Sequence, residues 1–376
     1  MEKTVTKPIR ILQVLTAMNR AGTETMLMNL YRAIDRDRVQ FDFAVTTTDH
    51  CDYDEEIVSL GGRIIHYPRY TGKNHFAYKK WWNDFFVSHP EYKIVHGHIG
   101  STASIYLKIA KKYGCFTIAH SHSTSGGFGI HKILYKVYSY STRNIADYFI
   151  GCSTEALVAR YGKKVADNHG ISKVLPNGID VVKYAVSETA RQDVLAEFGL
   201  SRETLVVGTV GRQTPPKNPL FILEVLRDLY KVEPTFKFLW AGTGEMKDIV
   251  EAKIKEYGLQ DNVILLGVRN DIPRILQALN VFILPSKFEG LPVIGVEVQA
   301  AGVPMLCSDK VSPEVNMSKC VTFLPIDSTV PWKKGVLQER KFRRVEESAS
   351  DVAKAGYDIQ ATSKWLMEFY EKHYNG

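Results

Sequence analysis

Short apolar runs alternate along the chain with longer stretches in which apolar residues recur every three or four positions. The runs at residues 9–15 and 41–46 predict buried strands, and residues 25–34 have the spacing of an amphipathic helix. The alternation returns in the second half, where strands are predicted at 205–210, 236–240, 263–266 and 281–284. Strands separated by helices are typical of α/β proteins with parallel sheets, and 376 residues are enough for two such domains.

The stretch from 280 to 302 combines a strand, a loop and a helix. Its apolar run, Val281–Leu284, is stopped by Pro285, and a polar loop leads to Pro292, which we expect at the first helical position. Gly302 is expected just past the end of the helix. The first-turn amides of a helix lack intrahelical partners and its dipole favours negative charge, so this stretch predicts an anion site.

Two carboxylates bracket this predicted site. Glu289 lies just before the helix, and Glu297 lies one turn inside it, on the same face as Val293. An anion at the first turn would therefore have Glu297 about 5 Å further along that face. A carboxylate repels phosphate but suits a vicinal diol, such as a ribose attached to that phosphate. An ordinary βα unit with two solvated glutamates has the same spacing, and both interpretations remain open.

Three more strand-to-helix turns carry candidate ligand groups. Arg212 and Lys217 project from a glycine-started loop after the strand at 205–210, and two cations on one loop suit a diphosphate. A solvated loop is the alternative. Gly22 lies where the first strand turns into a helix N-terminus, and Gly242 lies in a glycine-rich turn after the strand at 236–240.

Two predicted strands, 94–98 and 117–122, end in His-x-His. Period-two spacing places both histidines of a pair on one side of its strand. The carboxyl ends of parallel strands are also where α/β proteins bind ligands. Neither pair has an adjacent Asp, Glu or Cys of the kind that usually completes a metal cluster, so we expect no metal there.

Composition and charge narrow the class of protein. The net charge of +7 favours anionic partners, but its density is below that expected for a nucleic-acid binder, so no nucleic-acid partner is expected. Residues 9–15 are too few to span a membrane and lack a signal-peptide cleavage pattern, and the five scattered cysteines suit a reducing compartment. We therefore expect a cytoplasmic protein.

Two aromatic segments allow a packed or a membrane-facing interpretation. Residues 74–87 form a helical stripe flanked by lysines; the stripe is Tyr78, Trp81, Trp82, Phe85 and Phe86. The stripe could pack on the sheet, which we favour, or dock on anionic lipid. Residues 130–147 allow the same two interpretations, because basic side chains alternate there with tyrosines: Lys132, Tyr135, Lys136, Tyr138, Tyr140 and Arg143.

Together these motifs resemble the retaining GT-B glycosyltransferases of the GT4 group, over residues 9 to 374. Glu289 and Glu297, with seven residues between them and Gly290-Leu291-Pro292 after the first, resemble the E-x7-E signature of that group. Arg212 and Lys217 resemble its G-R-x4-K-[GN] diphosphate clamp, although Gln213 stands where a hydrophobic residue is common. The family usually has two glycines where this chain has Ala21-Gly22. Asp52 and Asp54 match the metal-binding D-x-D of GT-A enzymes, but they open a predicted short helix and are interpreted as structural.

The resemblance implies the GT-B fold, which consists of two Rossmann-like α/β domains facing across a cleft. Residues 1–180 would form an N-terminal acceptor-binding domain and residues 181–350 a C-terminal domain that binds the nucleotide sugar. Residues 351–376 would form a helix that crosses back to the first domain. The passage into the second domain is placed at the Asn-Gly-Ile-Asp run of residues 177–180.

The implied activity is hexosyl transfer from a nucleoside diphosphate sugar, most simply a UDP-sugar, to a hydroxyl acceptor with retention at the anomeric carbon. The nucleotide sugar is a co-substrate, and neither a metal nor another cofactor is implied. Arg212, Lys217 and the amides of Gly290, Leu291 and Val293 would stabilise the leaving diphosphate. Gly22, Gly242 and Arg269 would contact the donor, with Arg269 in a segment that lies over the base. Glu289 would lie near the sugar, Glu297 on the ribose, and His122, or His120 if the alignment shifts, near the reacting centre on the acceptor side.

Two runs narrow the resemblance to bacterial capsule and exopolysaccharide transferases: residues 22–31 and Ala119–His122. In those enzymes the acceptor would be a saccharide or a lipid-linked saccharide, and peripheral contact with the anionic inner face of the cell membrane would follow. Three alternatives stay open. They are a UDP-sugar epimerase of GT-B fold, a nucleotide-sugar-binding protein without turnover, and a metal-dependent hydrolase built on the two His-x-His pairs.

Overall fold

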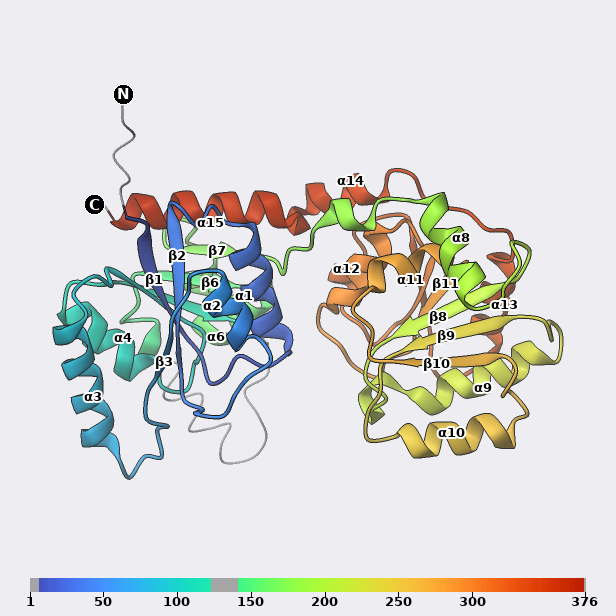
Figure 1. Ribbon diagram of the computed structural model, residues 1–376, viewed down its shortest axis with the longest axis horizontal. Coiled ribbons are helices and arrows are strands. Elements are labelled where there is room, and N and C mark those ends of the chain that lie inside the picture. Colours follow the sequence, from blue (N-terminus) through green and yellow to red (C-terminus); the bar gives the residue numbers. More distant parts are fainter. Residues whose placement is uncertain (1–6, 123–140, 375–376) are drawn as a thin grey trace. The chain divides into compact units, whose positions relative to one another are not determined.

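The computed structural model describes residues 7–122 and 141–374, and these residues form two compact units (Figure 1). Unit 1 comprises Met1–Gly178 together with Ile359–Gly376, and unit 2 is the continuous segment Ile179–Asp358. The chain therefore leaves unit 1 once and returns to it once. The run of residues 123–140, which includes the tyrosines of the second aromatic segment, lies outside the described residues.

Unit 1 is built on a seven-stranded sheet in the order β3-β2-β1-β4-β5-β6-β7, and every neighbouring pair is parallel. This order reverses between β1 and β4, as it does in a Rossmann-type sheet. The strands are β1 (Ile9–Val14), β2 (Val39–Val45), β3 (Ile64–His66), β4 (Ile94–Gly97), β5 (Phe116–Ser121), β6 (Tyr148–Gly151) and β7 (Ser172–Val174).

Helices cover both faces of this sheet, which is why its central strands are continuous apolar runs. All seven residues of β2 are buried. One apolar cluster centres on Tyr31 and Leu366, and a second centres on Trp82 and Tyr106. The described helices are α1 (Gly22–Ala33), α2 (Asp54–Ser59), α3 (His75–Ser88), α4 (Ala103–Lys112), α6 (Thr154–Tyr161), α7 (Lys163–Ala166) and α15 (Ile359–Tyr374).

Helix α15 packs on unit 1, as expected for the last helix of the GT-B fold. Its apolar side chains Leu366, Phe369 and Tyr370 are buried, and the helix packs against α1, β1 and β4. The helix begins at Ile359, later than residue 351, where the resemblance placed its start. Gly356, at a φ of +91°, breaks the helical path, and Tyr357 packs into the core of unit 2 before α15 begins.

Unit 2 repeats the same architecture with a six-stranded parallel sheet in the order β10-β9-β8-β11-β12-β13. Its strands are β8 (Val206–Val210), β9 (Lys237–Ala241), β10 (Val263–Gly267), β11 (Val281–Leu284), β12 (Met305–Ser308) and β13 (Val321–Leu324). Its α-helices are α8 (Glu188–Glu197), α9 (Pro219–Tyr230), α10 (Lys247–Glu256), α11 (Ile272–Ala278), α12 (Val293–Ala300), α13 (Val330–Gln338) and α14 (Ser348–Val352). The expected pair of Rossmann-like domains is therefore confirmed.

The aromatic stripe of α3 faces the core. Tyr78, Trp82, Phe85 and Phe86 are buried, which confirms the packed interpretation of this helix. Phe76, on another face of the helix, is 85% exposed. Among the helices in the described ranges, none is both long enough and apolar enough to cross a membrane.

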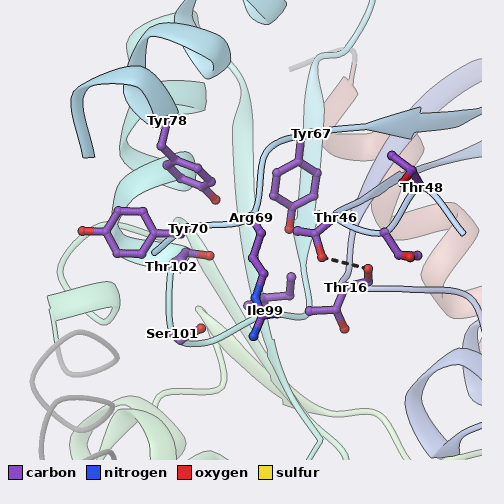
Figure 2. Close-up of a pocket in the computed structure, with 11 residues that line it drawn as sticks. Thr16, Thr46, Thr48, Tyr67, Arg69, Tyr70, Tyr78, Ile99, Ser101 and Thr102 are labelled. Carbon is purple, nitrogen blue, oxygen red and sulfur yellow. Dashed lines mark hydrogen bonds between the residues drawn. The ribbon is translucent and has the colours of Figure 1, made fainter. Parts of the chain in front are cut away.

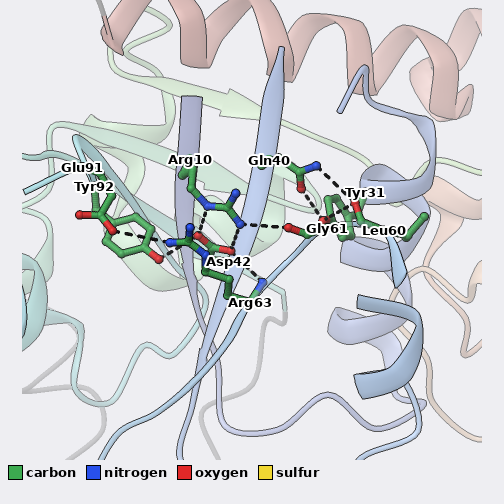
Figure 3. A network of polar contacts seen from close by, with 9 residues as sticks. All are labelled: Arg10, Tyr31, Gln40, Asp42, Leu60, Gly61, Arg63, Glu91 and Tyr92. Atoms are coloured by element: carbon green, nitrogen blue, oxygen red, sulfur yellow. Dashed lines mark hydrogen bonds and ion pairs between the residues drawn. The ribbon is translucent and has the colours of Figure 1, made fainter. Parts of the chain in front are cut away.

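A buried polar network joins Arg10, near the start of β1, to Asp42 in the middle of β2 (Figure 3). The Asp42 carboxylate is fully buried, and it accepts hydrogen bonds from Arg10 Nε at 2.5 Å and from the Tyr92 hydroxyl at 2.8 Å. The backbone amide of Arg63 donates to it as well, at 2.8 Å. Arg63 and Tyr92 lie just before β3 and β4, away from the carboxyl ends of the strands where ligands bind in such sheets, so the network is structural.

Candidate active site

The predicted cationic loop follows β8, where the strand order of unit 2 reverses between β8 and β11. Such a reversal is where open parallel sheets bind ligands. Arg212 is exposed, and none of the described side chains pairs with its guanidinium. Lys217 ends a 3-10 turn, and Asn218 after it has φ +58° and ψ +49°. This left-handed conformation favours Gly or Asn, which explains the residue type that follows the lysine.

The structure brings Lys217 and Glu289 together. Lys217 Nζ donates to Glu289 Oε2 at 2.6 Å, and the Ser286 hydroxyl donates to the other carboxylate oxygen. The Lys287 amide also donates to the Pro216 carbonyl at 2.8 Å, so the loops after β8 and β11 are joined by a side-chain and a backbone contact. Lys217 and Glu289 therefore form an ion pair, although they lie 72 residues apart in the sequence.

The N-terminus of α12 presents uncapped amides. Pro292 is the N-cap residue, with φ −70° and ψ 123°, and not the first helical residue as predicted. No side chain caps this end, and among the described residues the amides of Gly290, Leu291 and Val293 have no acceptor. Gly302 lies just past the helix with φ +64°, as predicted. Unpaired amides at a helix N-terminus are suited to an anion.

Glu297 lies one turn into α12 in a desolvated position. Burial raises the pKa of its carboxyl to about 7, and the Tyr184 hydroxyl donates to its Oε1 at 2.7 Å. Tyr184 was missed by the sequence analysis because it lies 113 residues earlier in the chain. Tyr184 therefore holds one of the two carboxyl oxygens of Glu297.

Two of the three remaining predicted donor residues, Gly242 and Arg269, make close contacts within unit 2, and Gly22 does not. A Cβ at Gly242 would lie 2.2 Å from the Gly211 carbonyl oxygen, so glycine is needed there for backbone packing between two loops. The side chain of Arg269 forms ion pairs with Asp271 at 2.8 Å and with Glu197 at 3.1 Å. Gly22 begins α1 without a positive φ, and a Cβ there would meet no atom within 4 Å. The conformation of the chain itself thus requires glycine at Gly242 but not at Gly22.

The two His-x-His pairs of unit 1 form one cluster, because β4 and β5 are neighbours. Ring centroids lie 4.4 Å apart within the His96–His98 pair and 4.1 Å apart within the His120–His122 pair, so each pair shares one side of its strand as predicted. His96 Nε2 lies 3.2 Å from His120 Nδ1, and His98 Nδ1 lies 2.8 Å from His122 Nε2.

Partners from distant segments fix this cluster. The Tyr370 hydroxyl of α15 lies 2.6 Å from His96 Nδ1, and Gln13 Oε1 lies 2.8 Å from His98 Nε2. Burial lowers the pKa of all four imidazoles, to about 3 for His96 and for His122, so the rings are neutral at physiological pH. His120 Nε2 and His122 Nδ1 are buried and have no hydrogen-bond partner in the described part of the chain.

Nitrogen atoms of His96, His98 and His120 lie within 4.8 Å of one another, so three neutral imidazoles could converge on a metal ion. Both nitrogens of His96 and of His98 are, however, already within hydrogen-bond distance of other groups. The Asp-x-Asp carboxylates make local contacts instead: Asp52 accepts from the Arg20 amide and Asp54 from the Cys51 amide, both at 2.8 Å.

Two Rossmann-like sheets, with a cationic loop and a glutamate-bearing helix at the reversal point of the second, define the class of GT-B glycosyltransferases. The model of "Glycosyltransferase Family 4" matches residues 20–183, and that of "Glycosyl transferases group 1" matches residues 191–318. EpsF of Bacillus subtilis (strain 168), which is named as a glycosyltransferase, is 30% identical over 97% of this chain and 98% of its own. The protein therefore belongs to the GT4 family of glycosyltransferases.

Two further proteins are similar to this chain. The UDP-Gal:alpha-D-GlcNAc-diphosphoundecaprenol alpha-1,3-galactosyltransferase of Escherichia coli is 31% identical over 61% of this chain and 60% of its own. The crystal structure of Anabaena Alr3699/HepE in complex with UDP has a TM-score of 0.76 and 15% identity, covering 96% of this chain and 100% of its own. This second likeness shows the shared GT-B fold.

Proposed function

We propose that this glycosyltransferase moves a hexose from a UDP-sugar to a hydroxyl group of a saccharide acceptor carried on a lipid, with retention at the anomeric carbon and without a metal ion. One arrangement in unit 2 carries this proposal. Lys217 forms an ion pair with Glu289 just before the N-terminus of α12, which no side chain caps, and Glu297 lies one turn inside that helix. It supplies cations and amides for a diphosphate and a carboxylate for a ribose.

The diphosphate contacts follow from charge and geometry. Arg212 offers a planar fork for paired oxygens, Lys217 offers a point charge, and the amides of Gly290, Leu291 and Val293 offer fixed dipoles. Such preorganised donors stabilise the charge that develops on a departing phosphate. The complex of HepE with UDP and the UDP-galactose named for the Escherichia coli enzyme support uridine as the nucleoside of the donor.

We expect the reaction to occur on one face of the sugar, because the described site places no carboxylate as an evident nucleophile. The bond between the anomeric carbon and the phosphate oxygen breaks, and that oxygen takes the proton of the acceptor hydroxyl. The acceptor oxygen then bonds to the anomeric carbon on the same face. Glu289, held by Lys217 and Ser286, would orient the sugar, and the neutral His122 or His120 of unit 1 would lie on the acceptor side.

The two glutamates should separate donor affinity from turnover. Above the Glu297 pKa of about 7 its carboxylate is ionised, and hydrogen bonds to a charged group contribute about 1.5–3 kcal/mol. At pH 8, Glu297→Gln should therefore weaken UDP and UDP-sugar binding about tenfold or more. At pH 6, where the wild-type carboxyl is protonated, the difference between the two proteins should shrink. Glu289→Gln should leave UDP affinity nearly unchanged and lower turnover.

Calorimetric titration with UDP at both pH values, beside initial rates, measures these effects. The opposite pattern, with UDP lost in Glu289→Gln and kept in Glu297→Gln, would reverse the orientation of the donor on α12. Release of an epimerised sugar from the UDP-sugar without acceptor would favour the epimerase alternative. Tight UDP binding with no transfer to a membrane extract would favour a binding protein.

Removal of divalent metal should leave the activity intact. Two cations and three amides already face the proposed diphosphate site, so a Mg²⁺ or Mn²⁺ ion is not needed to neutralise it. Initial rates are compared before and after dialysis against EDTA, with Mn²⁺ added back as the control. Strict dependence on Mn²⁺ would contradict the proposal and point to the nitrogens of His96, His98 and His120.

A further inference from the structure

A pocket of about 660 Å³ opens at the carboxyl edge of the unit 1 sheet (Figure 2). Its walls come from the loops that follow β1, β2, β3 and β4, and from the buried face of α3. The strand order reverses between β1 and β4, so the pocket lies where parallel sheets bind ligands. Its volume is within the range of about 300–1,000 Å³ that small-molecule sites occupy.

The lining of this pocket is unusually rich in hydroxyl groups. Five threonines, one serine and three tyrosines stand among its eleven lining residues. Of the described residues that line it, Arg69 alone carries a charge. The Arg69 side chain is exposed, and it forms neither an ion pair nor a hydrogen bond with any residue in the described ranges. The pocket therefore offers many hydrogen bonds and a single uncompensated cation.

Like the Arg69 guanidinium, the Tyr78 hydroxyl has no hydrogen-bond partner among the described residues. Tyr78 is fully buried, and Figure 2 shows its ring entering from α3 with the hydroxyl directed toward the side where Arg69 lies. The side chains of Thr102 and Trp82 approach it, but no described residue accepts or donates a hydrogen bond of good geometry there. A buried hydroxyl without a partner is costly, so a ligand that bonds to it would gain affinity.

An aromatic face completes the recognition surface. The half-buried Tyr70 ring lies against Tyr78 with centroids 5.1 Å apart, and its hydroxyl lies 3.2 Å from His75 Nδ1. An aromatic face carries negative charge density and suits the C–H face of a sugar ring. Ile99, which also lines the pocket, directly follows His98 of the histidine cluster.

We propose that this pocket binds the acceptor, and that Arg69 selects a saccharide carrying a negatively charged oxygen group, either a phosphate or a carboxylate. Tyr78 donates or accepts a hydrogen bond to the same ligand, and Tyr70 lies on its ring. This assignment rests on the proposed sugar transfer, since it names the substrate class of that reaction's acceptor. The phosphate of a lipid-linked sugar and the carboxylate of an acidic sugar share the chemistry that Arg69 recognises.

The test uses the full chain with three soluble probes: N-acetylglucosamine 1-phosphate, glucuronate and neutral N-acetylglucosamine. Binding is followed by saturation-transfer NMR titration. One of the anionic probes should bind the wild type about tenfold or more tightly than the neutral sugar, because bonds between ions are the stronger ones. Preference for the phosphate would identify a lipid-linked sugar as the source, and preference for glucuronate an acidic sugar.

Two variants and a control decide the roles of the residues. Arg69→Gln should reduce the affinity for the anionic probe to that for the neutral one. Tyr78→Phe should weaken the preferred probe about three- to tenfold and leave the melting temperature unchanged, since its hydroxyl bonds to no described group. Arg63→Gln removes the same charge at the opposite end of β3, where its guanidinium lies 3.7 Å from Glu91, and should change no probe affinity.

Titration of the same proteins with UDP separates the two proposals. UDP affinity should be equal in the wild type, Arg69→Gln and Tyr78→Phe, because the donor is assigned to unit 2. If UDP binds but Arg69→Gln leaves anionic probe binding unchanged, the pocket assignment is wrong while the donor proposal stands. Loss of UDP in Arg69→Gln, or competition by inorganic phosphate as strong as that by the sugar phosphate, would also overturn it. If the wild-type protein neither binds UDP nor transfers sugar, the proposed function itself is wrong.

Discussion

Replacing Arg212 with alanine is expected to lower the turnover number about 100- to 1000-fold, as loss of a preorganised charge stabiliser does. The guanidinium is exposed and pairs with no described residue, so its removal should leave the melting temperature nearly unchanged. The effect is measured as the rate at which UDP is formed from the UDP-sugar during transfer. Arg202→Ala is the matched control, since this exposed arginine of unit 2 pairs with Glu188 at 3.1 Å and should keep the wild-type rate within about twofold.

Lys217→Ala is expected to cause a similar loss, but through two contacts. The variant removes a cation from the diphosphate and also frees Glu289, which accepts from Lys217 at 2.6 Å. Residues in contact show non-additive effects. The double variant Lys217→Ala with Glu289→Gln should therefore lose less activity than the product of the two single losses. Near-native rates in both Arg212→Ala and Lys217→Ala would show that the leaving group is held elsewhere.

Asp42→Ala is expected to destabilise unit 1 by about 3–5 kcal/mol, because it leaves Arg10 and Tyr92 without the buried carboxylate that they share. For a unit of this size that corresponds to a fall of roughly 6–20 °C in melting temperature. Differential scanning fluorimetry of the whole chain, with hydrogen exchange of the β1 and β2 amides, assigns the loss to unit 1.

Asp84→Ala is the control for burial. Asp84 pairs with Lys80 at 2.6 Å, a distance like that of the Arg10 contact, but both side chains are exposed, at 62% and 77%. Exposed pairs contribute less than about 1 kcal/mol. Equal losses in Asp84→Ala and Asp42→Ala would contradict the view that burial sets the value of the Asp42 network.

The strands with strong local signals were predicted from the sequence to within about two residues of their observed bounds, and β11 was predicted with its observed bounds. Strand β11 spans Val281–Leu284, as the apolar run before Pro285 indicated, because a continuous apolar run between two breakers suits a buried parallel strand. Gly302 was placed correctly since its left-handed φ is a local requirement. The start of α15 was placed too early, because the side chains of α14 and of the turn at Gly356 are also amphipathic and only their packing in unit 2 separates them.

The local pieces of the candidate site were predicted, but their pairings were not. The glycine-started loop, the two glutamates and the two His-x-His pairs each have a short-range pattern. The bond between Tyr184 and Glu297 joins residues 113 apart, and that between Tyr370 and His96 joins residues 274 apart. Periodicity contains no information on such contacts, since they depend on how strands and helices are packed.

The divided sequence of unit 1 has a consequence for synthesis on the ribosome. Residues up to Gly178 emerge first, but α15, one of the helices that cover their sheet, emerges only after all of unit 2 has been made. Until then Phe41 and the other side chains that pack on Leu366 and Tyr370 lack the part of their cover that α15 supplies, and His96 lacks its tyrosine partner. Unit 2 is one continuous segment and meets no such delay. The first half of the nascent chain must therefore wait for the last helix, with its apolar surface open to chaperones or to other chains.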